Sequence, residues 1–215
     1  MINWKDFDTY IFDFDGTISD TGVGIIQALT KTLSEHNIHV TAKQLHPFIG
    51  PPVAQSLHNY LGLTDQRLID QIVARYRQIY YEDGCADMSA MYPGMKELLE
   101  DLHKKGKKLA IASLKPVRGL NYLSEKYGIK ELFSAICGPN EHEIPNTKDG
   151  VLNLVFQSLP KEKSLMIGDS AFDVDGAHVH GIPCIAVHYG FGLPHALSHA
   201  EAQAESVQEL RQLIL

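Results

Sequence analysis

The sequence predicts an α/β protein with a doubly wound, mostly parallel Rossmann-like sheet and a small all-helical domain inserted after the first strand. Short apolar runs of strand length alternate with helical segments along the second half of the chain. Residues 21–87 instead have helical periodicity, and acidic residues follow two of the expected strands directly. We therefore expect a core domain of residues 1–20 and 88–215 and a helical cap domain of residues 21–87.

The first element is an apolar strand over residues 9–14, and the insert follows it. Apolar residues recur with helical spacing at Ile25, Ile26, Leu29 and Leu33, and again at Leu68, Ile69, Ile72, Val73 and Tyr76. Pro47 and the run Gly50-Pro51-Pro52 interrupt this pattern, which predicts an irregular loop. Tyr92-Pro93-Gly94 is expected to close the insert.

The rest of the chain alternates between strands and helices. We expect strands at 109–113, 135–137, 165–167 and 184–187, and helices at 95–105, 118–127, 150–159, 173–179 and 207–213. Gly106 and Gly128 mark the ends of the first two helices, because glycine readily adopts the left-handed conformation that ends a helix. Short buried strands joined by helices favour a parallel sheet with helices on both faces.

Charge and composition exclude several classes of protein. The chain has 215 residues, with 19 basic and 26 acidic side chains and a net charge of −7, which argues against a nucleic-acid partner or an anionic membrane surface. Residues 1–10 lack a signal pattern, and no apolar stretch approaches the roughly 20 residues that span a bilayer. We expect a cytoplasmic protein, either a monomer or a homodimer.

Cysteines and histidines give no metal pattern. Cys85, Cys137 and Cys184 are widely spaced without a CxxC motif, so we expect buried free thiols. The 11 histidines include His178 and His180 but no HExxH motif, so surface or capping positions are expected.

Asp13 and Asp15 are the first candidate functional residues. They follow the first apolar strand in Tyr10-Ile-Phe-Asp-Phe-Asp-Gly-Thr17, and residues two apart on a strand project to the same face. Two adjacent carboxylates repel each other, and Mg²⁺, which prefers oxygen ligands, would offset that repulsion while leaving one oxygen free as a nucleophile. A solvated acidic turn at the end of a strand would give the same local pattern.

A second acidic cluster, Asp169 and Asp173, follows the apolar run 165–167. Ligands of open parallel sheets gather at the carboxyl ends of the strands, so the two clusters are expected to meet there. Asp169 is the natural metal ligand, and Asp173 either binds the ion or orients Asp169. Acids are also favoured at a helix N-terminus by the helix dipole, and Asp175 is assigned to that structural role.

At this point the chain resembles a known family. Four ordered motifs are similar to those of the haloacid dehalogenase superfamily of phosphatases: Asp13-Phe-Asp15-Gly-Thr17-Ile-Ser-Asp20, Ser113 in Ala112-Ser113-Leu-Lys-Pro116, Lys148, and Gly168-Asp169 with Asp173. Ile49-Gly-Pro-Pro52, Tyr92-Pro-Gly94 and the stretch from Gly168 to Gly192 are most similar to the phosphoglycolate phosphatase-like branch, which includes helical caps. The likeness covers nearly the whole chain.

The resemblance implies a Mg²⁺-dependent hydrolase of phosphoric monoesters whose substrate is a small phosphorylated metabolite of the phosphoglycolate or nucleotide type. Asp13 would attack phosphorus to form an aspartyl phosphate. Asp15 would protonate the leaving oxygen and then deprotonate the attacking water.

The remaining site residues are also implied by the resemblance. Ser113, Lys148, Thr17 and Gly16 would bind the substrate, and Mg²⁺ would be held by Asp13, Asp15 through its backbone carbonyl, Asp169 and Asp173. Lys115 is left open between phosphate binding and a structural role. Asp20 is expected to cap a helix or stabilise a turn.

Several alternatives remain open. A sugar phosphomutase or a pyrophosphatase of the same superfamily would share these acids, and a non-catalytic phosphate- or Mg²⁺-binding protein could keep the scaffold. A dehalogenase does not need the acid at Asp15. A phosphonate hydrolase would need a cap lysine, which residues 46–95 lack, but Lys31 and Lys43 keep this alternative open. Substrate specificity is expected in the cap, with Gly50-Pro51-Pro52 as its candidate loop, and the acidic segment 140–146 is expected to face solvent.

Overall fold

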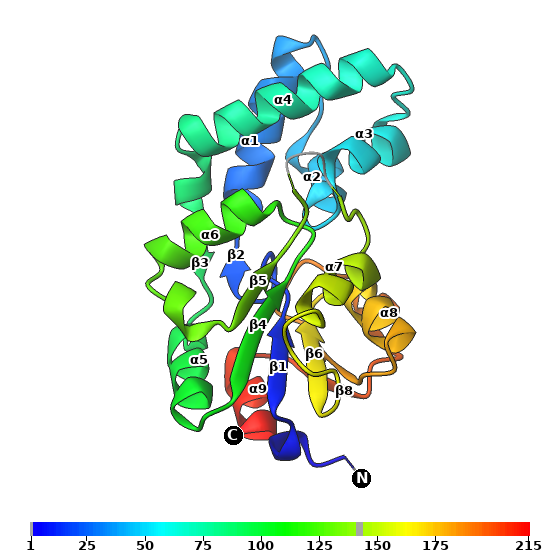
Figure 1. The fold of residues 1–215 in the computed structure, drawn as a ribbon. Helices are drawn as coiled ribbons and strands as arrows, with labels where there is room; N and C mark the ends of the chain where they lie inside the picture. The colour runs from blue at the N-terminus through cyan, green and yellow to red at the C-terminus, as the bar shows by residue number, and fades with distance from the viewer. Residues whose placement is uncertain (1, 141–143) are drawn as a thin grey trace. The chain divides into compact units, whose positions relative to one another are not determined.

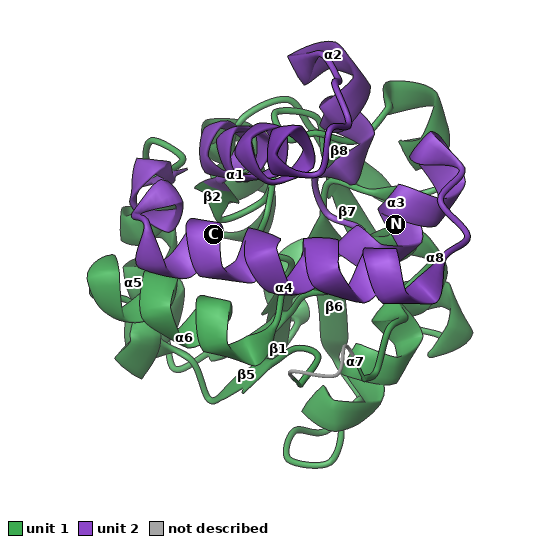
Figure 2. Ribbon diagram, turned by 90° about the horizontal axis from the view of Figure 1, so that it is seen from above, with its two compact units in different colours: residues 1–19, 91–215 green, residues 20–90 purple. Residues whose placement is uncertain are grey.

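The computed structural model describes residues 2–140 and 144–215, which form two compact units. Unit 1 contains the residues up to Ser19 together with Met91–Leu215, and unit 2 is Asp20–Ala90 (Figure 2). The sequence-based domain boundaries fall near the same two points, after residues 20 and 87. The acidic segment 140–146, which is expected to face solvent, includes residues 141–143, and these lie outside the described residues.

Unit 1 is built on a six-stranded sheet in which every strand pairs in parallel with its neighbours. The strand order is β5-β4-β1-β6-β7-β8, with β1 Thr9–Phe12, β4 Lys108–Ala112, β5 Ala135–Cys137, β6 Ser164–Gly168, β7 Cys184–Val187 and β8 Ala202–Ala204. The register places Phe12 of β1 beside Ile111 of β4 and Ile167 of β6. The residues that follow these three central strands therefore emerge at the same edge of the sheet.

Helices cover both faces of this sheet (Figure 1). They are α5 Met95–Lys104, α6 Val117–Lys126, α7 Lys148–Val155, α8 Ala171–Val179 and α9 Val207–Ile214, with short 3-10 turns at Trp4–Asp6, Lys130–Leu132 and Pro194–Leu197. Tyr10 and Phe12 pack toward α5, α6 and α9, whereas Ile11 packs toward α7 and α8. This alternation along β1, which is buried on both faces, confirms the doubly wound α/β fold that the sequence predicts.

Unit 2 is helical. It contains α1 Gly22–Glu35, α2 Ala42–Leu45, α3 Val53–Leu61 and α4 Gln66–Glu82, with 3-10 turns at His46–Phe48 and Cys85–Met88. Ion pairs of Arg75 with Glu35 at 2.6 Å and of Lys31 with Asp83 at 2.7 Å join α4 and the residue after it to α1. A Cβ atom on Gly24 would lie 2.1 Å from the carbonyl oxygen of Cys85, so the close packing of α1 on the following turn requires glycine.

The short strands β2 (Ser19–Asp20) and β3 (Ala90–Met91) pair with each other where the chain leaves and re-enters unit 1. Neither strand is predicted from the sequence, because two residues carry no readable periodicity. The carboxylate of Asp20 accepts a hydrogen bond from the N–H of Gly22 at 3.1 Å, which is the turn-stabilising role expected for it.

All three cysteines are free, as the sequence predicts. Cys85 and Cys184 are buried, but Cys137 is only half-buried, so the expectation of burial is wrong at this position. Cys137 lies in β5, the edge strand of the sheet, which is covered less completely than the central strands. His178 lies in the last turn of α8 and pairs with Glu201, and His180 caps the C-terminus of the same helix.

Among residues 2–140 and 144–215, no helix combines the length and the apolar character needed to cross a membrane.

Candidate active site

The turn after β1 places Asp13 and Asp15 at the carboxyl edge of the sheet. Both carboxylates are buried, with 5% and 6% of the residue exposed, so neither is a solvated surface acid. Gly16 adopts a positive φ of 91°, and a Cβ atom there would lie 2.2 Å from a carboxylate oxygen of Asp169. Glycine is therefore required at this position both by the backbone and by the close approach of Asp169.

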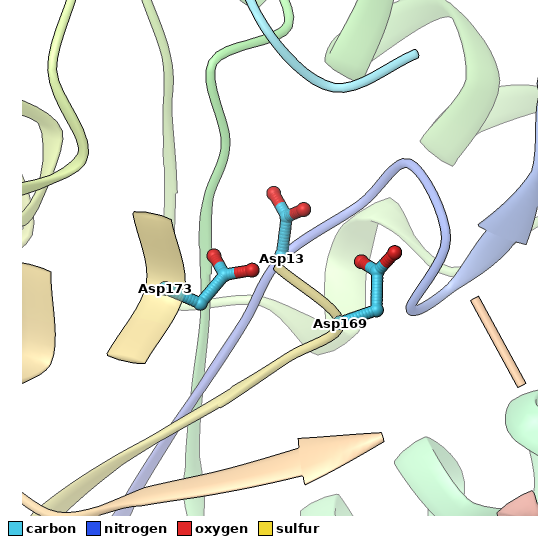
Figure 3. A group of neighbouring side chains, drawn as sticks. All are labelled: Asp13, Asp169 and Asp173. Atoms are coloured by element: carbon cyan, nitrogen blue, oxygen red, sulfur yellow. The ribbon is translucent and has the colours of Figure 1, made fainter. Parts of the chain in front are cut away.

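Asp13, Asp169 and Asp173 form one cluster. Each offers a carboxylate oxygen, and these three oxygens lie within 4.8 Å of one another. Figure 3 shows the three side chains projecting to the same side from three segments: the residue after β1, the residue after β6 and the first turn of α8. The structure thus brings Asp13 together with Asp169 and Asp173, which lie more than 150 residues further along the chain, whereas the Asp15 carboxylate is not part of this cluster.

Two hydrogen bonds fix the orientation of Asp169. Its Oδ1 accepts from the hydroxyl of Thr17 at 3.0 Å, and its Oδ2 accepts from the backbone N–H of Phe191 at 2.7 Å. The loop of Phe191 approaches so closely that a Cβ atom on Gly190 would lie 2.4 Å from Asp169, and one on Gly192 would lie 1.7 Å from its carbonyl oxygen. The sequence analysis assigns no role to this loop, although Gly190 and Gly192, which follow β7, are a signal of such a close approach.

Gly16 and Thr17 use their polar groups inside the turn. The N–H of Gly16 donates to the carbonyl of Ser19 at 2.9 Å, and that of Thr17 donates to Phe14 at 3.3 Å. Because the Thr17 hydroxyl binds Asp169, both residues shape the turn that holds Asp169. Their direct contact with substrate stays a prediction.

Lys148 links two of the acids. Its Nζ lies 2.8 Å from Oδ1 of Asp13 and 2.6 Å from Oδ1 of Asp173, and it donates to the carbonyl oxygen of Ala112 at 2.8 Å. The other oxygen of Asp173 accepts from the N–H and the hydroxyl of Ser170, as the N3 residue of the capping box that begins α8. Asp173 therefore positions the Lys148 ammonium. Its carboxylate is also close enough to Asp13 for both to bind one metal ion.

Lys148 is the first residue of α7, two residues before the expected start of this helix. Thr147 caps α7 by accepting from the N–H of Gly150 at 3.3 Å. Burial alone would lower the pKa of Lys148, but the charges of Asp13 and Asp173 outweigh burial and raise the pKa. The side chain therefore stays a cation.

Ser113 follows β4 at the same edge of the sheet and is buried. Its hydroxyl accepts a hydrogen bond from the backbone N–H of Lys115 at 3.3 Å and does not contact the carboxylates of Asp13, Asp15, Asp169 and Asp173. The ammonium of Lys115 reaches Asp15, at 3.1 Å from Oδ1 and 3.3 Å from Oδ2.

The charges of the site are unequal. Four buried carboxylates, those of Asp13, Asp15, Asp169 and Asp173, face two buried ammonium groups, those of Lys115 and Lys148, which leaves 4 − 2 = 2 negative charges when all are ionised. Asp169 contacts neither lysine, and burial together with the charges of Asp13 and Asp173 raises its pKa well above the usual range. A divalent cation with oxygen ligands would neutralise this excess, so the cluster fits a Mg²⁺ site.

Comparison with known proteins identifies the family. The family model described as haloacid dehalogenase-like hydrolase matches residues 10–187. The chain belongs to the haloacid dehalogenase-like hydrolases. This assignment confirms the family resemblance and the enzyme class predicted from the motifs.

Several members of the family are similar over most of this hydrolase. A protein named tyrosine-protein kinase PtkA from Mycobacterium tuberculosis is 30% identical over 211 residues, which cover 95% of this chain and 71% of that protein. A 5'-nucleotidase from Pseudomonas aeruginosa is 31% identical over 85% of this chain and 83% of its own length. A phosphoglycolate phosphatase from Aliivibrio fischeri is 29% identical over 94% and 93%.

The fold of this hydrolase also matches solved structures. A crystal structure of a predicted phosphatase from Clostridium acetobutylicum superposes with a TM-score of 0.90 and 29% identity, and the match covers 96% of this chain and 97% of that one. The match includes residues of both the sheet and the helical insert, since nearly the whole of each chain is covered.

Proposed function

We propose that this hydrolase is a Mg²⁺-dependent phosphatase that removes the phosphoryl group from a small phosphomonoester through an aspartyl phosphate on Asp13. The observation that carries the proposal is the position of Asp13, which belongs to the acid cluster with Asp169 and Asp173 and lies 2.8 Å from the Lys148 ammonium, with Asp15 two residues away in the chain. Phosphoryl transfer needs mainly a nucleophile, nearby positive charge and a proton donor, and this edge of the sheet supplies each of them.

Asp13 is the nucleophile in this proposal. Its Oδ1 is engaged by Lys148, so Oδ2 forms the bond to phosphorus while the bond from phosphorus to the leaving oxygen breaks. Asp15 gives its proton to that leaving oxygen. In the second half of the reaction, water attacks phosphorus, Asp15 takes a proton from the water, and the phosphate departs with restoration of the Asp13 carboxylate.

Mg²⁺, when bound, supplies positive charge that offsets the excess negative charge of the acids and the phosphoryl group. Asp13, Asp169 and Asp173 would hold it together with the backbone carbonyl of Asp15. Lys148 keeps its charge beside Asp13 and neutralises the transferring oxygens. The Ser113 hydroxyl accepts from the N–H of Lys115, so its own proton is available for donation to a phosphoryl oxygen.

The substrate proposed is of the phosphoglycolate or nucleotide type, supported by the names of two relatives that cover most of the chain. The related assignments are tested in parallel. A phosphomutase would return a phosphate isomer in place of inorganic phosphate, a pyrophosphatase would act on pyrophosphate, and a binding protein would turn over none of these compounds. Supplying ATP with a tyrosine-containing peptide tests the activity that the name of the PtkA relative suggests.

The experiment measures phosphate release from an aryl phosphate, phosphoglycolate, nucleoside monophosphates, sugar phosphates and pyrophosphate, with Mg²⁺ or with a chelator. We expect turnover that requires Mg²⁺ and is abolished in Asp13→Asn. The matched control is Asp175→Asn, which changes an exposed acid of α8 that contacts His199 and should leave the rate unchanged. Full activity in chelator, or in Asp13→Asn, would refute the proposal.

A further inference from the structure

Lys115 is a buried cation to which the proposed reaction assigns no role. Only 6% of the residue is exposed, and its Nζ lies 3.1 and 3.3 Å from the two carboxylate oxygens of Asp15. Taking an ammonium group out of water is costly unless a partner of opposite charge is close. The position of Lys115 thus requires a specific partner, and the structure gives it the acid proposed to move protons.

The backbone around Lys115 is built to hold it there. The N–H of Lys115 donates to the Ser113 hydroxyl, and the N–H groups of Ser113 and Val117 donate to carbonyl oxygens at and after the end of β5. A Cβ atom on Gly138 would lie 2.4 Å from the carbonyl oxygen of Lys115, so the segment after β5 comes this close only because residue 138 is glycine. The turn between β4 and α6 is therefore fixed, and its lysine can reach Asp15 from a defined origin.

Proton transfer to a leaving oxygen depends on the orientation of the acid. A displacement of about 1 Å in a catalytic group can lower a rate on the order of a hundredfold. Asp15 lies in the turn that contains Gly16, and the Lys115 ammonium contacts both of its oxygens. We propose that Lys115 is a positioning residue that holds the Asp15 carboxylate in line with the leaving group. This inference rests on the proposed phosphatase function.

The competing role for Lys115 is direct binding of the phosphoryl group. The two roles affect different steps. A residue that binds the phosphoryl group contributes equally to kcat/KM for every phosphomonoester, and it also strengthens the binding of inorganic phosphate. A residue that orients the proton donor matters most for esters whose leaving oxygen is strongly basic, because a weakly basic leaving group departs without protonation.

The test compares kcat/KM for a series of substituted phenyl phosphates, since kcat/KM reports the steps up to departure of the first product. In Lys115→Met, we expect a fall of about 10- to 100-fold for phenyl phosphate and less than about threefold for 2,4-dinitrophenyl phosphate. The plot of log kcat/KM against leaving-group pKa thus becomes steeper. Lys115→Arg, which keeps the charge, should recover part of the slope.

Two controls accompany the series. Lys107→Met removes another lysine of unit 1, whose Nζ donates to the carbonyl oxygens of Lys5 and Phe7, and should leave the slope unchanged. Inhibition by inorganic phosphate is measured for each variant, and thermal unfolding verifies that each is folded. If Lys115→Met fails to fold, the slope of Lys115→Arg decides the matter, because a longer, planar cation displaces Asp15 without removing the charge.

Three results would overturn the assignment. An equal fall for all esters with weaker phosphate inhibition would make Lys115 a phosphate ligand, and an unchanged slope with unchanged inhibition would make the ion pair purely structural. If the wild-type protein hydrolyses none of the esters, the proposed function itself fails and this inference falls with it. Wild-type turnover with an unaltered slope in the variants, in contrast, refutes only the role of Lys115.

Discussion

Asp169 is the residue whose ionisation should depend most on a bound cation. Burial and the charges of Asp13 and Asp173 raise its pKa, so the folded state holds this proton more tightly than the unfolded state does. Its contribution to stability is greatest below the ordinary aspartate pKa of about 3.9 and is lost as the pH rises through the raised value. Without a cation, a rise in pH above the ordinary aspartate range therefore destabilises the fold.

Asp169→Asn should consequently be more stable than the wild type in chelator at pH 7. The amide can keep both contacts, because its oxygen accepts from Phe191 while its NH₂ donates to the Thr17 hydroxyl. The stability difference between the two proteins should shrink as the pH falls toward 4. Added Mg²⁺ should stabilise the wild type, by about 2.7 kcal/mol at a hundredfold excess over Kd, but not the variant.

Thermal unfolding at pH 4 to 7, with and without Mg²⁺, checks these expectations. Asp175→Asn is the control, since it removes one acid from the same helix outside the cluster. A variant less stable than the wild type in chelator, or one that Mg²⁺ still stabilises fully, would contradict the proposal that Asp169 is a buried carboxylate whose ionisation is costly without Mg²⁺.

The individual acids could be found from the sequence, but their partners could not. Asp13, Asp15, Asp169 and Asp173 each follow an apolar run or begin a helix, which is a local pattern. The hydrogen bond from Phe191 to Asp169 and the ion pair of Lys115 with Asp15 join segments far apart in the chain. Such contacts depend on which strands become neighbours and on how closely glycine lets the loops approach.

At the level of elements, α7 shows how an N-cap residue determines the position of Lys148, a candidate substrate-binding residue. The sequence predicts this helix from Gly150, but Thr147 begins it and puts Lys148 in the first turn. A cation is disfavoured at the N-terminus of a helix by the dipole, so local propensity gives no reason to place Lys148 there. Its ion pairs with Asp13 and Asp173 outweigh that effect.

The strand β8, which has the sequence Ala-Gln-Ala, is also not predicted from the sequence. Its pairing with β7, rather than its own composition, makes it a strand.

Removing the N-cap side chain of α7, that of Thr147, should therefore lower the stability of the protein. We expect Thr147→Ala to lower the free energy of unfolding by about 1 kcal/mol, because the N–H of Gly150 loses its acceptor. Thr147→Ser, which keeps the hydroxyl, should change it by less than about 0.5 kcal/mol. Urea denaturation of the three proteins measures the difference. Equal stabilities of the alanine and serine variants would show that Thr147 does not determine where α7 begins.

At the scale of the whole molecule, the charged residues of the candidate site all belong to one of the two units. Unit 1 contains the four buried acids of the site, its two buried lysines, and two apolar clusters on the faces of its own sheet. Ser19 and Met91 lie in the paired strands β2 and β3, so the chain leaves and returns at neighbouring points. Ile18 is buried in the core of unit 1 and belongs with it.

A chain that lacks Asp20–Ala90, with Ser19 joined to Met91 by a short Gly-Ser linker, should therefore fold and keep the metal site. We expect a cooperative thermal transition that Mg²⁺ shifts upward, and loss of that shift when Asp169→Asn is introduced into the shortened chain. If the cap selects the leaving group, hydrolysis of an aryl phosphate should persist while the kcat/KM values for phosphoglycolate and nucleotides become similar. Circular dichroism and phosphate release measure the two effects. A chain without a cooperative transition would show that unit 1 depends on unit 2 for its fold, and unchanged selectivity would place the specificity in unit 1, beside Asp13 and Asp15.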